Sequence, residues 1–265
     1  MNAYIKLIDC IKSSKSILCV GLDTDITKLP KIFSSDLDSI TEFNKAIIDA
    51  TKEYACAYKI NFAFYEQYGT DGFRLLENSL KLIPDNKFII ADAKRGDIGN
   101  TSKAYATAVF DYLRADAITV NPYMGYDSIA PFLDYENKLT FILALTSNPG
   151  SNDFQRLKVN EEALYTRVIK TTLGYANTQS IGFVVGATHP EELAEIRKIA
   201  PNNFLLIPGI GTQGGNIEKT LSANNNGPAV INVSRDIIYA SDKEDFADRA
   251  NEKARSYRNL LGTIQ

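Results

Sequence analysis

The chain has 265 residues, which is long for an average domain but within the usual range of a single α/β barrel. Its hydrophobic fraction of 45% and charged fraction of 23% are those of an ordinary globular protein with a sizeable core. The net charge of -3, with lysines and arginines scattered among the acids, argues against a nucleic-acid-binding surface.

The cysteine and histidine content restricts the compartment and the chemistry. Cys10, Cys19 and Cys56 lack metal-ligand spacing, and the first residues carry no long apolar run for export, so we expect a cytoplasmic protein. The apolar runs are far shorter than the roughly twenty residues that span a bilayer, so no membrane association is expected. A single histidine, His189, excludes histidine-rich metal sites. The chemistry should come mostly from carboxylates and amines.

In chain order, a helix is expected at residues 3–12, before the first strand. Eight short, apolar, β-branched runs then follow, at residues 17–22, 55–60, 87–91, 117–121, 140–145, 181–185, 204–208 and 229–233. Segments of helical period lie between them, at residues 39–54, 72–83, 101–114, 160–176 and 190–200. This alternation is typical of parallel βα units.

Two of these helical segments begin with helix-start signals. Thr188 and Pro190 precede a pair of glutamates, and Asn160 precedes Glu161 and Glu162, which predicts capped helix N-termini at both places.

Eight βα units close most economically as a (β/α)₈ TIM barrel, here as one domain over residues 1–265 with an extra N-terminal helix. An open, doubly wound sheet is the alternative. The choice decides where a site lies, because in a barrel the polar residues at the carboxyl ends of the strands meet at one mouth.

The third predicted strand ends in a charged cluster, Asp92, Lys94 and Asp97. Strand alternation places Asp92 and Lys94 on one face, where an acid and an amine are costly to bury unless they pair. Acids on both sides should keep Lys94 an ammonium, ready to donate a proton. An ordinary surface salt bridge is the alternative for an arbitrary D-x-K-x-x-D. The position at the end of the third predicted strand favours an active-site cluster over a surface salt bridge.

Charges also end the first two predicted strands, Asp23 after the first and Lys59 at the second. Each alone is more often a residue at the rim with its charge in water. Together with the third-strand cluster they place charges at three adjacent strand ends, which is typical of a barrel active site.

The turns after the last two strands have the composition of a phosphate site. Glycines in IPGIGTQGGN, including Gly209 and Gly211, allow backbone N–H groups to approach an oxyanion, and Gln213 and Arg235 can add side-chain donors. A tight turn and a helix cap are the alternative. The loop after strand five, LTSNPGSNDFQ, predicts a lid in which Ser147 can hydrogen-bond a heterocyclic base.

With these motifs in place, the sequence resembles the orotidine 5'-phosphate decarboxylase family, in its longer bacterial branch. The resemblance covers nearly the whole barrel: DAKRGDIGNT, TSNPGS, PGIGTQGG, Asp23, Lys59 and Arg235. It implies decarboxylation of orotidine 5'-monophosphate to uridine 5'-monophosphate in de novo pyrimidine biosynthesis, with no cofactor and no metal.

The resemblance also implies a role for each matching residue. Lys94 would protonate C6 of the pyrimidine, and Asp92 would lie beside the substrate carboxylate and hold Lys94. Lys59 would bridge the ribose and the acids, and Asp23 would bind a ribose hydroxyl. The further contacts would be Ser147 to the pyrimidine edge, Gln213 and Arg235 with the glycines to phosphate, and Asp97 and Thr101 to the neighbouring subunit of a homodimer.

Two positions depart from the more familiar branch of this family. Ser234 precedes Arg235 where glycine is common, and Arg95 and Gly96 lie between Lys94 and Asp97 where small or apolar residues are often found.

Three other functions are weighed against this one. A magnesium-dependent sugar-phosphate decarboxylase or aldolase would keep D-x-K-x-x-D but require the metal. A Schiff-base aldolase would use Lys94 or Lys59 as a neutral amine. A non-catalytic nucleotide sensor could share the fold, because fold alone does not imply function.

Overall fold

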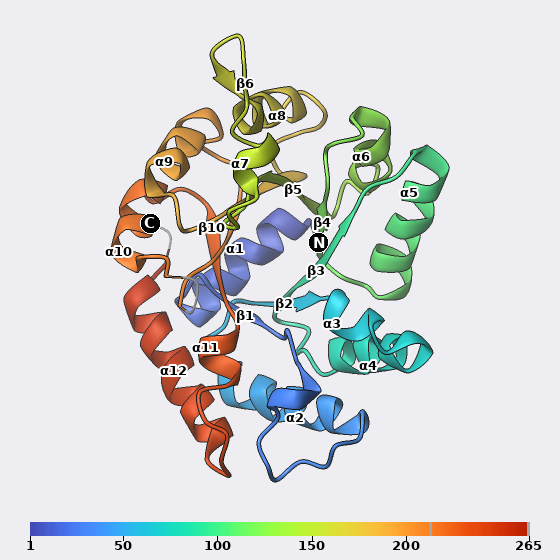
Figure 1. Cartoon of the computed structure of the whole chain (residues 1–265), viewed down its shortest axis with the longest axis vertical. Helices are drawn as coiled ribbons and strands as arrows, with labels where there is room; N and C mark the ends of the chain where they lie inside the picture. The colour runs from blue at the N-terminus through green and yellow to red at the C-terminus, as the bar shows by residue number, and fades with distance from the viewer. Residues whose placement is uncertain (212–213, 264–265) are drawn as a thin grey trace. The chain divides into compact units, whose positions relative to one another are not determined.

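The computed structural model describes residues 1–211 and 214–263. Eight parallel strands form a closed barrel in the order β1-β10-β9-β8-β5-β4-β3-β2, with helices between successive strands (Figure 1). All eight expected strands are confirmed, and so is the helix before the first strand, α1 (Ala3–Ser14). The expected (β/α)₈ barrel is therefore correct, and the open doubly wound sheet is wrong.

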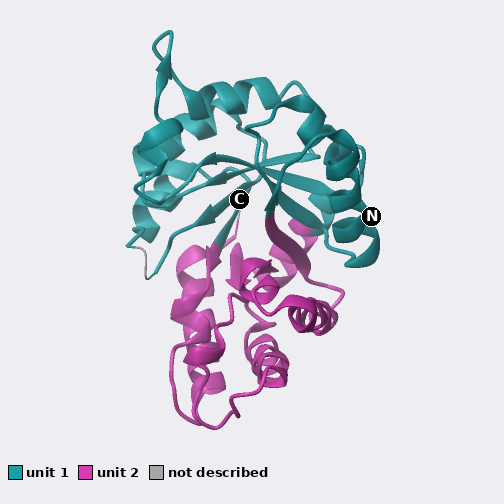
Figure 2. Cartoon of the chain, turned by 45° about the vertical axis from the view of Figure 1, so that its right-hand side comes forward, with its two compact units in different colours: residues 1–6, 94–231, 264–265 teal, residues 7–93, 232–263 magenta. Residues whose placement is uncertain are grey.

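The chain divides into two compact units, which Figure 2 colours separately. Among the described residues, unit 1 comprises Met1–Lys6 and Lys94–Ile231, and unit 2 comprises Leu7–Ala93 and Asn232–Thr263. Two strands, β3 (Phe88–Arg95) and β10 (Ala229–Val233), and the helix α1 contribute residues to both units.

Unit 2 holds the first strands of the barrel and the last helices of the chain. Its remaining elements are β1 (Leu18–Gly21), the 3-10 helix η1 (Ile26–Lys28), α2 (Asp38–Thr51), β2 (Ala57–Asn61), α3 (Ala63–Glu66), α4 (Gly69–Lys81), α11 (Arg235–Ile238) and α12 (Phe246–Leu261). The strands β1, β2 and β3 pair in parallel, so that Gly21 lies opposite Lys59 and Asn61 opposite Asp92. The polar ends of these strands thereby reach the same edge of the sheet.

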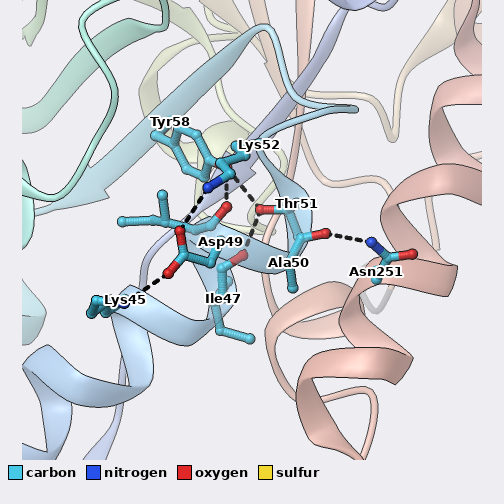
Figure 3. A network of polar contacts seen from close by, with 9 residues as sticks. Lys45, Ile47, Asp49, Ala50, Thr51, Lys52, Tyr58 and Asn251 are labelled. Atoms are coloured by element: carbon cyan, nitrogen blue, oxygen red, sulfur yellow. Dashed lines mark hydrogen bonds and ion pairs between the residues drawn. The ribbon is translucent and has the colours of Figure 1, made fainter.

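The strand β2 is anchored to α2 through Tyr58. The Tyr58 phenol forms a hydrogen bond of 2.8 Å with the Thr51 hydroxyl, and Asn251 of α12 donates to the Ala50 carbonyl at 2.8 Å (Figure 3). Because successive side chains of a strand point to opposite faces, Tyr58 directs Lys59 away from α2.

Unit 1 contains the remaining strands and helices. They are α5 (Gly99–Ala106), the π-helix η2 (Thr107–Tyr112), β4 (Ala117–Val120), α6 (Tyr126–Leu133), β5 (Leu139–Leu145), α7 (Ser151–Phe154), β6 (Lys158–Val159), β7 (Glu162–Ala163), α8 (Leu164–Thr172), β8 (Ile181–Val185), α9 (Pro190–Ile199), β9 (Leu205–Pro208) and α10 (Ile217–Asn224). Its barrel strands β4, β5 and β8 are almost entirely buried, whereas the hairpin strands β6 and β7 are not. The largest enclosed side chains of the unit include Phe132, Phe141, Phe183 and Phe204. Burial of each such side chain stabilises the unit by roughly 1.5–3 kcal/mol.

The helix expected at residues 160–176 begins later than predicted. Asn160 and Glu161 have φ of 51° and 63°, and they form the turn of an antiparallel hairpin, β6–β7, that precedes α8. Two left-handed residues suit a tight hairpin turn and cannot belong to a right-handed helix. The predicted cap at Asn160 is therefore wrong, and Ala163 takes that position.

The helix expected from residue 190 is confirmed, with Pro190 in its first turn and acids at Glu191 and Glu192. Its N-cap is His189, which makes no side-chain capping bond. Among residues 1–211 and 214–263, no helix has the length and apolar character needed to cross a membrane.

Candidate active site

The acids and amine at the ends of β1, β2 and β3 form a chain of ion pairs within unit 2. The Lys59 Nζ lies 2.9 Å from Asp92 Oδ2 and 3.3 Å from Asp23 Oδ1. Lys59 is 4% exposed and Asp92 is 7% exposed, so most of this charge is removed from water. The structure thus brings together three of the predicted site residues, Asp23, Lys59 and Asp92.

The charge of Lys59 is maintained by its two partners. Burial favours the neutral amine, but the charges of Asp23 and Asp92, together with the hydrogen bond to Asp92, outweigh it and raise the pKa of Lys59 above its ordinary value. A lysine held in this way is a permanent cation at neutral pH. It can bind an anion or a hydroxyl, but it is not suited to form a Schiff base.

Buried polar groups fix the loop that carries Asp23. The Thr24 hydroxyl donates to Asn44 Oδ1 at 2.6 Å, and the Tyr65 phenol donates to the Leu22 carbonyl at 3.1 Å. On the other side of the loop, the Tyr239 phenol accepts a hydrogen bond of 2.7 Å from the Asp25 backbone N–H. These contacts hold the residues that flank Asp23, and so restrict where its carboxylate can point.

Lys94 differs from Lys59 in backbone and in exposure. Its side chain is exposed, and its φ of 47° lies in the left-handed region. The alternation of a strand therefore does not extend to Lys94, and the expectation that Lys94 and Asp92 share a face stays a prediction. The Lys94 N–H donates to the Thr119 hydroxyl of β4 at 3.0 Å.

Asp97 and Thr101 lie at the beginning of α5 in unit 1. The Asp97 Oδ1 accepts a hydrogen bond of 2.7 Å from the Ile98 N–H, and the Ser102 hydroxyl donates to the Asp97 carbonyl at 2.8 Å. Asp97 and Thr101 are partly exposed, and Ile98 between them is 56% exposed. This turn is therefore ordered and lies at the surface of unit 1.

The loop after β5 is folded onto the short helix α7. Gln155 accepts a hydrogen bond of 2.8 Å from the Thr146 N–H, and the Thr146 hydroxyl donates to Asn148 Oδ1 at 2.6 Å. Ser147 is half-buried next to Gly186, where an added Cβ would lie 2.8 Å from the Ser147 nitrogen. The base of the loop is thus fixed, whereas residues 148–150 are exposed.

The candidate phosphate residues lie on two separate stretches of chain. Gly209 and Gly211 have φ of 103° and 87°, which explains glycine at both positions without reference to a ligand. Gln213 lies outside the described residues. Arg235 is exposed at the first position of α11, and the preceding Ser234 donates to the Gly21 carbonyl at 3.0 Å. The side chain of Ser234 thus links the start of α11 to β1, a contact that glycine could not make.

Comparison with known proteins identifies the family. The model of the "Orotidine 5'-phosphate decarboxylase / HUMPS family" matches residues 16–250. The chain belongs to this family. A relative from Christiangramia forsetii, named orotidine 5'-phosphate decarboxylase, is 50% identical over 264 residues and covers 97% of each chain. This similarity identifies the chain as a carboxy-lyase of the family.

Two solved structures of the family match over nearly the whole chain. Leishmania donovani OMP decarboxylase has a TM-score of 0.83 and 39% identity, with coverage of 98% of this chain and 100% of the other. Leishmania donovani UMP synthase has a TM-score of 0.86 and 40% identity over 97% of this chain, which spans 57% of that longer protein.

Asn44 and Thr119, which hold Thr24 and Lys94 by hydrogen bonds, were not among the site residues predicted from the sequence. A signal existed for Asn44, because it shares the buried face of α2 with Ile40, Phe43 and Ile47. A polar residue at such a position predicts a buried hydrogen-bond partner. No comparable signal marks Thr119, since threonine is common in strands.

Proposed function

We propose that this chain decarboxylates orotidine 5'-monophosphate to uridine 5'-monophosphate in pyrimidine biosynthesis. The observation that carries the proposal is the chain of ion pairs Asp23–Lys59–Asp92. It lies in a protein that is 50% identical to a relative named orotidine 5'-phosphate decarboxylase. We propose further that the reaction needs no cofactor and no metal, that the chain acts as a single domain, and that it works in the cytoplasm.

The proposed reaction breaks the bond between C6 of the pyrimidine and its carboxylate. Carbon dioxide leaves, the electron pair stays on C6, and Lys94 transfers an ammonium proton to C6 before regaining one from solvent. With no cofactor to accept the electron pair, the transition state requires positive charge already in place. An ammonium at about 4 Å from the developing carbanion contributes on the order of 4 kcal/mol at an effective dielectric of 20.

The remaining stabilisation is proposed to come from contacts to the rest of the nucleotide. Asp23 and Lys59 would bind ribose hydroxyls, which suits a carboxylate and an ammonium fixed by a buried ion pair. Ser147 would contact the pyrimidine edge. Arg235, Gln213, Gly209 and Gly211 would bind the phosphate, whose binding energy would hold the base in place and close the loop after β5.

We also propose a homodimer in which Asp97 and Thr101 reach the site of the neighbouring subunit. Their position in an ordered turn at the surface of unit 1 supports this arrangement. Inactive Lys94→Ala and Asp97→Ala chains should complement each other when mixed. Equal amounts make half of the dimers hybrids, each with one complete site, so about a quarter of the parent activity should return. Hybrids that form without activity would contradict shared sites.

The decisive experiment is a decarboxylation assay that follows the loss of orotidylate absorbance with a chelator present. Full activity is expected, and activity restored only by added magnesium would instead favour the sugar-phosphate enzymes that share D-x-K-x-x-D. Borohydride treatment in the presence of substrate should trap no covalent adduct, because the amine of a Schiff-base enzyme must be neutral. Nucleotide binding without turnover would favour the sensor.

A further inference from the structure

The backbone at Lys94 adopts a conformation that a lysine rarely takes. Its φ of 47° is left-handed, and Lys94 has a Cβ that crowds the backbone there, unlike glycine. Such a conformation persists only where the surroundings determine it, and residues of this kind are concentrated at functional sites. Contacts with neighbouring segments must therefore hold the left-handed backbone at Lys94.

Three contacts within unit 1 join residues 94–96 to β4 and to the residue that follows it. The Lys94 N–H donates to the Thr119 hydroxyl at 3.0 Å, and the Asn121 N–H donates to the Arg95 carbonyl at 2.8 Å. Gly96 packs so closely that an added Cβ would lie 2.9 Å from the Asn121 carbonyl oxygen. Of the two hydrogen bonds, only the one to Thr119 depends on a side chain, so it is the one that a substitution can remove.

The side chain of Arg95 leaves this turn in another direction. Its guanidinium lies over the ring of Tyr105 of α5, 5.2 Å from the ring centre. This contact accounts for the large residue between Lys94 and Gly96, and it gives the turn a further attachment within unit 1. The backbone at Lys94 is thus held by a contact at its own N–H and by contacts of the next residue, Arg95.

We propose that Thr119 is a positioning residue for the reaction: its hydroxyl accepts the Lys94 N–H and thereby fixes the left-handed backbone from which the Lys94 ammonium is presented. The inference rests on the proposed role of Lys94 as proton donor. Thr119 is 1% exposed, so the hydroxyl acts from within the barrel wall rather than on the substrate. Its effect on catalysis passes through Lys94.

The neighbouring strand supplies a matched control. Thr140 of β5 is also a fully buried strand threonine, and its hydroxyl has no hydrogen-bond partner among the described residues. The change from threonine to valine keeps the shape and removes only the hydroxyl. Both changes remove a buried hydroxyl, but only Thr119→Val also removes the acceptor of the Lys94 N–H.

The experiment compares kcat and KM for Thr119→Val, Thr119→Ser and Thr140→Val in the full chain with orotidine 5'-monophosphate. Thr119→Val should lower kcat by about 10- to 100-fold, because small misplacements of a reacting group have effects of this size. Its KM should stay within about threefold, since the proposed ribose and phosphate contacts are unchanged. Thr119→Ser should recover most of kcat, and Thr140→Val should keep it. Parental kcat in a folded Thr119→Val would overturn the proposal.

Hydrogen exchange at the Lys94 amide gives a readout independent of turnover. That amide should be protected in the parent, in Thr119→Ser and in Thr140→Val, and should exchange faster in Thr119→Val. Equal protection in all four proteins would overturn the proposal even if kcat fell, since the Lys94 N–H would then not depend on the Thr119 hydroxyl. A parent chain without orotidylate turnover would instead count against the proposed function, while the exchange data would still test the contact.

Discussion

The two ends of the paired strands β2 and β3 each bury a lysine, and the two lysines behave in opposite ways. Lys59, near the carboxyl end of β2, lies within 3.3 Å of Asp23 and 2.9 Å of Asp92, and its pKa is raised. Lys87, directly before β3, donates to the Ala55 carbonyl at 2.9 Å, and burial lowers its pKa. The two lysines are 4% and 6% exposed.

The difference lies in the partners rather than in the depth of burial. A carbonyl satisfies one donor of an ammonium but does not balance its charge, so desolvation dominates at Lys87. Two carboxylates balance the charge at Lys59. The carboxyl end of this strand pair therefore holds a lysine that stays charged, at the end of the barrel where active sites lie, whereas the charge of the lysine at the amino end is not balanced.

The largest expected effect tests whether the carboxyl end of β3 carries the chemistry. Lys94→Ala should lower kcat by at least about 10³-fold, because it removes on the order of 4 kcal/mol of charge stabilisation as well as the proton donor. Orotidylate absorbance measures the loss, and thermal unfolding should be nearly unchanged. Lys198→Ala, which removes an exposed lysine paired with Glu195 on α9, is the control. Substantial activity in Lys94→Ala would remove the proposed mechanism.

The next effect tests the balanced charge at Lys59. Lys59→Met removes the ammonium that Asp23 and Asp92 share, which should lower the free energy of unfolding by about 3–5 kcal/mol and also lower turnover. Denaturant unfolding at pH 7 measures the loss of stability. A loss below about 1 kcal/mol at pH 7 would show that the ion pairs contribute little to stability.

The raised pKa of Lys59 also predicts the alkaline limit of its contribution. Above the ordinary lysine value of about 10.4, the unfolded chain loses its proton first, so this part of the stability is present below that pH and is lost as the pH rises through the folded-state pKa. The decline should be absent from Lys59→Met.

A smaller effect is expected for Arg235, the proposed phosphate contact at the start of α11. Arg235→Ala should raise KM by roughly 10- to 100-fold with less change in kcat, since a hydrogen bond to a charged group contributes about 1.5–3 kcal/mol. Arg255→Ala removes another exposed arginine in the same unit, on α12, and should leave KM unchanged. An unchanged KM in Arg235→Ala would count against the phosphate assignment.

The smallest effect is expected at the amino end of the strand pair. Lys87→Met should change the free energy of unfolding by less than about 1 kcal/mol, because removing an unbalanced buried charge offsets the lost hydrogen bond. The pH dependence should be opposite to that of Lys59. A lowered folded-state pKa makes the parent more stable as the pH rises toward about 10.4, and Lys87→Met should lack this rise. If Lys87→Met instead lost several kcal/mol of unfolding free energy, the proposed difference between the two ends of the strand pair would be wrong.

The sequence by itself determined the positions of the eight barrel strands and the charges at three of their ends. Short apolar, β-branched runs are a local signal, because a strand buried on both faces needs apolar side chains wherever it lies. Asp23, Lys59 and Asp92 were recognised in the same way, as charges that interrupt such runs. The family motifs then indicated the chemistry.

Only the tertiary structure decided which groups meet. Lys59 contacts acids 36 and 33 residues away, and its pKa follows from those contacts rather than from its neighbours in the chain. The hairpin at Asn160 overrode a helical pattern, and the left-handed turn at Lys94 depends on Thr119, 25 residues further on. Periodicity records which side of an element is buried, whereas partners and local backbone strain depend on how distant segments pack.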